Sequence, residues 1–181
     1  MNKPRPIIPI QAARPAGEAD DGVQFEFLVL EGAQAGLSWA TVLHRRAGYR
    51  QAFAAFDPEK VARFSPARLA RLVRDPGIIR NRQKIEATIG NARAYLKIAE
   101  GQGFDAFLWR YVEGRAVQNH FAALSDVPAR TALSERISKD LGKAGFKFVG
   151  PTITYAFMQA VGMVNDHLVT CPCHDRVAAL A

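Results

Sequence analysis

The stretch best suited to chemistry is a carboxylate, Glu31, followed eight residues later by an indole, Trp39. Glu31 comes directly after the largely apolar run 25–30, so we expect it at the buried end of a helix. Gly32 and Gly36 allow the chain to turn there, or another group to approach closely. A carboxylate and an indole at such a bend suit a pocket for a flat, electron-poor ring, through hydrogen bonding and stacking. The alternative is an ordinary helix end, with Glu31 in solvent and Trp39 in the core.

A second stretch, residues 145–152, joins two predicted helices through a very short turn. Gly145 suits the end of the first helix, and Gly150 permits a backbone conformation that other residues avoid. Pro151 suits the first position of the second helix, whose free N–H groups can bind an anion such as a DNA phosphate beside Lys147. The pattern is typical of a helix-hairpin-helix element, which grips the DNA backbone without reading sequence. An ordinary tight connection between helices has the same pattern.

The elements that position these stretches are predicted to be helices, because apolar residues recur at helical spacing and no alternating strand pattern or internal repeat is present. We expect an all-α fold with a single helical domain over 21–181. An irregular arm at 1–20 precedes it, because prolines and Gly17 interrupt regular structure there. The segment 112–127 is predicted to be mostly loop. The predicted helices span 21–32, 38–53, short segments opening at Asp57-Pro58 and Ser65-Pro66, 80–100, 104–111, 131–144 and 151–161.

The charge balance favours a polyanionic partner. The 181 residues include 24 Lys and Arg against 17 Asp and Glu, a formal net charge of +7. Such an excess indicates DNA or RNA binding, although a basic enzyme without such a partner is the alternative. No apolar run reaches the roughly 18 residues of a membrane span, and the N-terminus lacks the apolar segment of a secretory signal. The two cysteines, Cys171 and Cys173, are too few for a disulfide scaffold, which favours a reducing, cytoplasmic setting.

Segments from residue 25 to about residue 171 resemble the DNA-3-methyladenine glycosylase I family, in order and at matching spacing. The segments are 30–39, 77–82, 90–95, 145–150 and 164–167. The resemblance implies the helix-hairpin-helix DNA glycosylase fold, with two helical lobes and a pocket between them. It also implies a monomeric base-excision repair enzyme that hydrolyses the N-glycosidic bond of 3-methyladenine in alkylated double-stranded DNA. Such enzymes flip the damaged nucleotide out of the duplex, and the cationic base is already a good leaving group.

The same resemblance assigns roles to single residues. Glu31 becomes the catalytic and base-binding residue, because it accepts hydrogen bonds from the flipped base and attracts its positive charge. Trp39 stacks on the base. Related helix-hairpin-helix glycosylases carry a catalytic aspartate where this chain has the neutral amide of Asn165, and Asp166 is expected to point elsewhere. The residues expected to contact DNA are Gln34, Gly36, Leu37, Lys147 and Gly150.

The chain departs from the family near its N-terminus. In the family, a Cys and a His there join a C-terminal His and Cys in binding a structural zinc, and aromatic residues there complete the base pocket. His167 and Cys171 keep the C-terminal half, but the first 24 residues contain no Cys, His, Trp or Tyr. A closed zinc site needs four ligands, so we expect an incomplete site unless Cys173 and His174 supply the rest in a cramped arrangement. Alternatively, His167 packs or caps and Cys171 is an idle thiol.

Two explanations for this departure stay open. One is a wrongly chosen start or a shifted reading frame upstream, with family-like sequence resuming at residues 14–18. The other is a degenerate member that has lost activity. The functional alternatives are therefore a non-catalytic DNA-binding remnant that lacks the N-terminal pocket and zinc segment, and a basic helical scaffold for a protein partner.

Overall fold

The computed structural model describes residues 21–179; the arm expected at 1–20 and residues 180–181 lie outside the described residues. The described part is mostly helical, as predicted, and none of its helices is long and apolar enough to cross a membrane. Its α-helices are α1 Asp21–Gln34, α2 Trp39–Leu43, α3 Arg46–Ala52, α4 Pro58–Ala62, α5 Pro66–Leu72, α6 Arg82–Ala99, α7 Phe104–Trp109, α8 Ala132–Lys143, α9 Pro151–Ala160 and α10 Cys173–Ala178. Short 3₁₀ helices lie at Ala54–Phe56, Arg110–Val112 and Leu124–Asp126.

Local sequence explains where several of these helices begin. The Asp57 carboxylate accepts a hydrogen bond from the backbone N–H of Glu59, 3.0 Å away, at the start of α4. The Ser65 hydroxyl accepts from the N–H of Arg68 at 3.2 Å, at the start of α5. Both helices carry proline in the first turn, where the missing N–H costs nothing. These two short helices confirm the prediction made from their Asp-Pro and Ser-Pro pairs.

One expectation is wrong in detail. The helix expected over 38–53 is two helices, α2 and α3, because the chain changes direction at residues 44–45. With that change, Arg46 and Arg50 on α3 both donate to the buried carboxylate of Glu26 on α1. The segment 112–127 is mostly loop, as predicted, but it also contains β1 Val117–Gln118, which pairs in parallel with β2 Val164–Asn165. Two-residue strands are too short to show an alternating pattern, so periodicity cannot reveal them.

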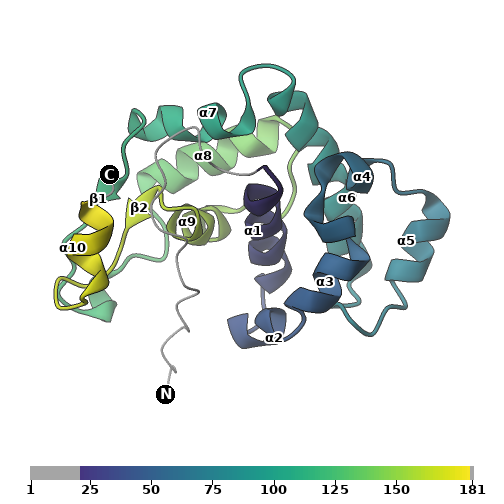
Figure 1. Ribbon diagram of the computed structural model, residues 1–181, viewed down its shortest axis with the longest axis horizontal. Coiled ribbons are helices and arrows are strands. Elements are labelled where there is room, and N and C mark those ends of the chain that lie inside the picture. Colours follow the sequence, from purple (N-terminus) through teal and green to yellow (C-terminus); the bar gives the residue numbers. More distant parts are fainter. Residues whose placement is uncertain (1–20, 180–181) are drawn as a thin grey trace.

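Helix α1 runs through the middle of the molecule, between two groups of helices (Figure 1). It contacts α6 on one side and α9 on the other, while α4 packs on α6 and α8 packs on α9. A row of buried aromatic rings crosses the interior from α1 to α7: Phe25 meets the edge of Tyr95 at 5.5 Å, and Tyr95 lies 4.2 Å from Phe104, between ring centroids. This arrangement agrees with the predicted fold class of two helical lobes.

The connection between α8 and α9 is the short hairpin, residues 144–150. The left-handed backbone of Gly145 fits the predicted end of the first helix, whereas that of Phe148 was not expected from the sequence. Gly150 has φ −58° and ψ 161°, which any residue adopts, so the conformation expected there is wrong. The left-handed residues are Gly145 at φ 101° and Phe148 at φ 56°. A bulky residue in that region costs on the order of 1–3 kcal/mol, so the surroundings of Phe148 must hold it there.

Three polar side chains hold the hairpin in this shape. The buried amide of Asn91 on α6 donates to the carbonyl of Lys147 at 2.9 Å and accepts from the N–H of Lys147 at 2.8 Å. Two residues after Lys147, the carbonyl of Val149 accepts hydrogen bonds from the hydroxyls of Ser138 at 2.6 Å and Thr154 at 2.9 Å. The hairpin is therefore fastened to α6, α8 and α9 together.

Replacing Asn91 with leucine tests whether its two hydrogen bonds to Lys147 stabilise the hairpin. Asn91→Leu keeps the side-chain volume roughly constant but leaves the N–H and the carbonyl of Lys147 without their partner, so we expect a loss of about 1–3 kcal/mol in the free energy of unfolding. Urea unfolding followed by circular dichroism measures it. The matched variant is Ser138→Ala, which leaves Thr154 on the Val149 carbonyl, so its loss should be the smaller one. Equal losses in the two variants would contradict the special role of Asn91 in holding the hairpin.

Candidate active site

Glu31 lies in the last turns of α1 and is only 6% exposed, so the alternative that placed it in solvent is wrong. Gln24 is two helical turns earlier on the same face, and its amide donates to the Asp105 carboxylate on α7 at 2.6 Å. That face of α1 is therefore directed toward the lobe that contains α7. A carboxylate in such a protected place attracts a cation more strongly than one on the surface, because water screens it less.

Glu31 and Trp39 lie on either side of a short turn between α1 and α2. The turn reverses at Gly36, whose φ is 77°, and α2 starts at Trp39 with Ser38 as its capping residue. Trp39 is partly buried and packs against the core, whereas Leu37 at the tip of the turn is 38% exposed. The turn thus presents an apolar side chain to solvent between the buried carboxylate and the partly buried indole.

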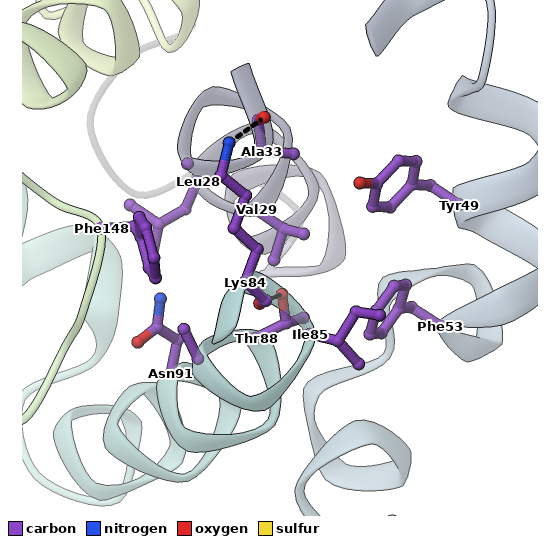
Figure 2. A pocket seen from close by; sticks show the side chains of 12 residues that line it. Leu28, Val29, Ala33, Tyr49, Phe53, Lys84, Ile85, Thr88, Asn91 and Phe148 are labelled. Atoms are coloured by element: carbon purple, nitrogen blue, oxygen red, sulfur yellow. Dashed lines mark hydrogen bonds between the residues drawn. The ribbon is translucent and has the colours of Figure 1, made fainter. Parts of the chain in front are cut away.

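Lys84 on α6 braces this turn from the other side (Figure 2). Its ammonium donates to the carbonyl of Ala33 at 2.8 Å and to that of Ala35 at 2.6 Å. These carbonyls lie at the C-terminal end of α1, where a helix attracts positive charge. Partial burial lowers the pKa of Lys84 from its ordinary value. Gln34, expected on DNA, donates its amide to the carbonyl of Leu37 at 2.7 Å and so also supports the turn.

The hairpin approaches α1 at the residue next to Glu31. A Cβ atom on Gly32 would lie 3.4 Å from the carbonyl oxygen of Phe148 and 3.5 Å from its Cβ, so glycine gives the hairpin room at this point. Lys147 and Gly150 are exposed on the hairpin. Because Gly150 caps α9 without a side-chain hydrogen bond, the first N–H groups of α9 remain suited to an anion. The carboxylate helix and the hairpin are therefore in direct contact.

A small cavity lies beside this contact, between α1, α6 and the hairpin (Figure 2). Leu28, Val29, Gly32 and Ala33 line it from α1, whereas Glu31 does not line it. Its volume of about 10 Å³ is enough for about one water molecule. A purine base does not fit into it, so this cavity is a packing gap and not the site of base binding.

Neither Asn165 nor Asp166 is arranged as a general base. Asn165 is 1% exposed, and its amide donates to the Gln118 side chain at 2.8 Å and to the His174 carbonyl at 3.0 Å. Asp166 accepts from Tyr155 and Gln159 on one oxygen and from Asn119 on the other, each at 2.7 Å. Burial and the bond to Asp166 raise the pKa of Tyr155 above its ordinary value. Both carboxylate oxygens of Asp166 are thus used in hydrogen bonds that support the fold.

A group of metal-ligating side chains lies near the C-terminus. Within residues 21–179, His167, Cys171 and Cys173 place their donor atoms within 4.8 Å of one another. Cys171 Sγ lies 3.6 Å from His167 Nδ1, and both cysteines are free thiols. His174, the fourth residue considered from the sequence, points away: its ring nitrogens lie 2.9 Å from Asp175 Oδ1 and 3.0 Å from the Asn119 carbonyl. Three donors of a kind that binds metal are therefore together.

The sequence did not single out three residues that shape the site: Lys84, Asn91 and Phe148. Asn91 carried a usable signal, since it is a polar residue on the apolar stripe of α6, where buried polar groups are hydrogen-bonded. Lys84 looked like one of the solvent-facing charges of the same helix. Nothing in the sequence around Phe148 indicates a left-handed backbone, because glycine is the residue that usually marks one.

Known proteins similar to this chain agree with one another. The methyladenine glycosylase family model matches residues 13–174. The DNA-3-methyladenine glycosylase 1 of Escherichia coli strain K12 is 51% identical over 158 residues, covering 87% of this chain and 84% of that protein. The DNA-3-methyladenine glycosylase of Haemophilus influenzae is 45% identical over 157 residues, covering 86% and 85%.

A solved structure shares the fold as well. The 3-methyladenine DNA glycosylase I of Staphylococcus aureus, in a structure concerned with recognition of 3-methyladenine, superposes with a TM-score of 0.84 at 37% identity. It covers 90% of this chain and 86% of that one. The residues 13–174 that match the family model include the hairpin and the turn from Glu31 to Trp39. The chain therefore belongs to the methyladenine glycosylase family.

Proposed function

We propose that this protein is a DNA-3-methyladenine glycosylase, which binds alkylated double-stranded DNA and hydrolyses the N-glycosidic bond of 3-methyladenine. The observation that carries the proposal is the buried carboxylate of Glu31 on α1, directly before the glycine on which the hairpin packs. The relatives from Escherichia coli and Haemophilus influenzae, which bear this activity in their names, support it across more than four-fifths of the chain.

Hydrolysis of this N-glycosidic bond needs little help from a general base. In 3-methyladenine the purine carries a positive charge, so cleavage of the bond between C1′ and N9 sends the electron pair to N9 and leaves a neutral base. Water supplies the hydroxyl group to C1′, and its proton goes to solvent. The carboxylate of Glu31 accepts hydrogen bonds from the flipped cationic base, and Trp39 stacks on its face. The saturated contacts of Asn165 and Asp166 fit a reaction driven by the leaving group.

Selection of the lesion follows from the same charge. A charge-assisted hydrogen bond is worth about 1.5–3 kcal/mol, and stacking a cation on an indole adds about 0.5–2 kcal/mol. Neutral adenine gains neither charge term, so it binds more weakly in the same place. Glu31 is thus proposed as both the base-binding and the catalytic residue, because it holds the base in the position from which it departs.

The hairpin is the proposed grip on the DNA backbone. Lys147 is exposed there, and the exposed Gly150 precedes the start of α9, whose first N–H groups suit a phosphate. Across the contact at Gly32, the turn between α1 and α2 presents the exposed Gly36 and Leu37, and we place them at the gap that the flipped nucleotide leaves. Gln34 then acts by bracing that turn through the Leu37 carbonyl. We propose a monomer, since one chain carries both parts.

We further propose that the three metal-ligating side chains near the C-terminus bind zinc and that the role of this zinc is structural. Imidazole nitrogen and thiolate sulfur, which His167, Cys171 and Cys173 offer, are the donors of structural zinc sites. In a tetrahedral site with the usual bond lengths, a nitrogen and a sulfur ligand lie about 3.5 Å apart. The 3.6 Å between Cys171 Sγ and His167 Nδ1 fits this value. Free thiols also fit the proposed cytoplasmic location.

Glu31→Gln tests the proposed reaction. The wild-type protein should release 3-methyladenine from methylated duplex DNA, measured by chromatography of the free base. Glu31→Gln removes the negative charge but keeps the shape, so its affinity for methylated duplex DNA, in which the damaged base is still cationic, should fall about 10- to 100-fold, as the loss of about 1.5–3 kcal/mol requires. Calorimetry measures this affinity.

Unmodified duplex DNA is the control ligand, since its neutral adenines gain no charge term and its weaker binding should change little between the two proteins. Glu26→Gln is unsuitable as a control because Arg46 and Arg50 both depend on Glu26. If the wild-type protein binds duplex DNA in a salt-dependent manner but releases no base above buffer at micromolar concentration, the protein is the non-catalytic binder and the proposal fails.

Lys147→Glu tests whether the hairpin binds the DNA backbone. Reversing this charge on the hairpin should weaken binding to undamaged duplex DNA and reduce its dependence on salt, because a phosphate contact is lost and replaced by repulsion. Fluorescence anisotropy at several salt concentrations measures both effects. Lys60→Glu is the matched control: it makes the same charge change on α4, where the Lys60 side chain is 69% exposed. Equal weakening in both variants would mean that net charge alone, rather than the hairpin, governs binding.

A further inference from the structure

The C-terminal donors are held together by local backbone structure. The N–H of Cys171 donates to the carbonyl of Leu168 at 2.7 Å, a turn that brings Cys171 back over His167. The N–H of Val169 donates to the carbonyl of Phe121 at 3.0 Å, which ties the same turn to the rest of the lobe. The N–H of His174 then donates to the Cys171 carbonyl at 2.9 Å, as α10 begins at Cys173. Both cysteines therefore belong to one short segment whose backbone is held by hydrogen bonds.

The group has a buried side and an open side. His167 is 9% exposed and lies at the protected end. Cys171 and Cys173 are partly exposed, on either side of Pro172. A metal ion seated between the three donors would have protein on one side and solvent on the other. This geometry resembles zinc sites that have three protein ligands and an open fourth position.

We infer that this chain binds its metal locally, through His167, Cys171 and Cys173, with the fourth coordination position open to water or a small thiol. The inference deepens the proposed zinc site and rests on it. In the arrangement expected from the family resemblance, the other ligands come from the N-terminal segment. Here residues 1–24 contain no Cys or His, and the three clustered donors are all contributed by seven consecutive residues. Cys173 therefore takes the place of a ligand from outside the C-terminal turn.

His174 is excluded as the fourth ligand by its contacts. Its side chain is 7% exposed, and both of its ring nitrogens are engaged, by Asp175 and by the Asn119 carbonyl. Its own carbonyl accepts from the buried amide of Asn165. Moving its ring toward the thiols would break all of the ring contacts. His120 is exposed and lies against the His174 ring, at 5.2 Å between centroids.

Titration of the full-length, metal-free, reduced protein with Co²⁺ tests the inference. Cobalt takes the place of zinc and absorbs light in a thiolate charge-transfer band, whose intensity increases with the number of bound thiolates. The wild-type protein should bind one equivalent with the intensity of two thiolates. Cys173→Ser and Cys171→Ser should each halve the band and weaken binding by more than about 100-fold, because even the loss of a residue that only supports a ligand costs 10- to 100-fold.

Two sets of control variants make the result specific. His120→Gln, on the exposed neighbour of His174, should leave stoichiometry and affinity unchanged. The triple variant Glu18→Gln, Asp20→Asn, Asp21→Asn removes every carboxylate in residues 1–21 and should also bind cobalt as the wild-type protein does. Circular dichroism confirms that each variant is folded.

Three results would overturn the inference. They are no cobalt uptake by the folded wild-type protein, an unchanged band and affinity in Cys173→Ser, or a loss of affinity in the triple carboxylate variant. Because the titration does not depend on base release, it separates this inference from the proposed glycosylase activity. A protein that binds cobalt through two thiolates but releases no base would retain the metal site and lose the proposed enzyme function.

Discussion

The close contact between α1 and the hairpin at Gly32 is the constraint on which the rest of the site depends. A Cβ atom at that position would lie 3.4 Å from the carbonyl oxygen of Phe148, already at van der Waals contact, so a side chain larger than that of alanine would press on the hairpin. The hairpin itself is under strain, since Phe148 adopts a left-handed backbone that bulky residues avoid. Contacts from α6, α8 and α9 hold it in place, above all the two hydrogen bonds from Asn91 to Lys147.

That contact joins the two parts of the proposed reaction. Glu31 precedes Gly32 on the same helix, and Lys147 precedes Phe148 on the hairpin, so the group proposed to hold the base and the group proposed to hold the phosphate are each one residue from the contact. Glycosylases of this kind must place an extruded base at a fixed distance from the backbone that they grip. A rigid contact suits that requirement better than a flexible one, and Lys84 adds to the rigidity by bracing the end of α1.

In the C-terminal segment, the β1–β2 pair and nearby side-chain hydrogen bonds hold the chain around the proposed metal site. The β1–β2 pair places Asn119 beside Asn165 and Asp166. The Asn119 side chain donates to Asp166, and the Asn119 carbonyl accepts from the ring of His174. These bonds fix the chain just before and just after the turn that carries His167 and Cys171. The proposed metal site is thereby built on a segment that is already ordered by polar contacts, which lowers the entropy cost of assembling its ligands.

The sequence by itself determined the helical class, most helix boundaries and the segments that carry the site. Those features depend on signals within a few residues of each other: apolar periodicity, the caps at Asp57 and Ser65, and the family motifs around Glu31 and the hairpin. The tertiary structure alone decided how the motifs meet. Asn91 binds Lys147 across 56 residues of sequence, and Lys84 reaches Ala33 across 51. A local pattern carries no information about partners so distant, because the bond forms only when packing has brought the two helices together. The same reason explains the break between α2 and α3 and the left-handed backbone at Phe148, both of which serve contacts with other elements.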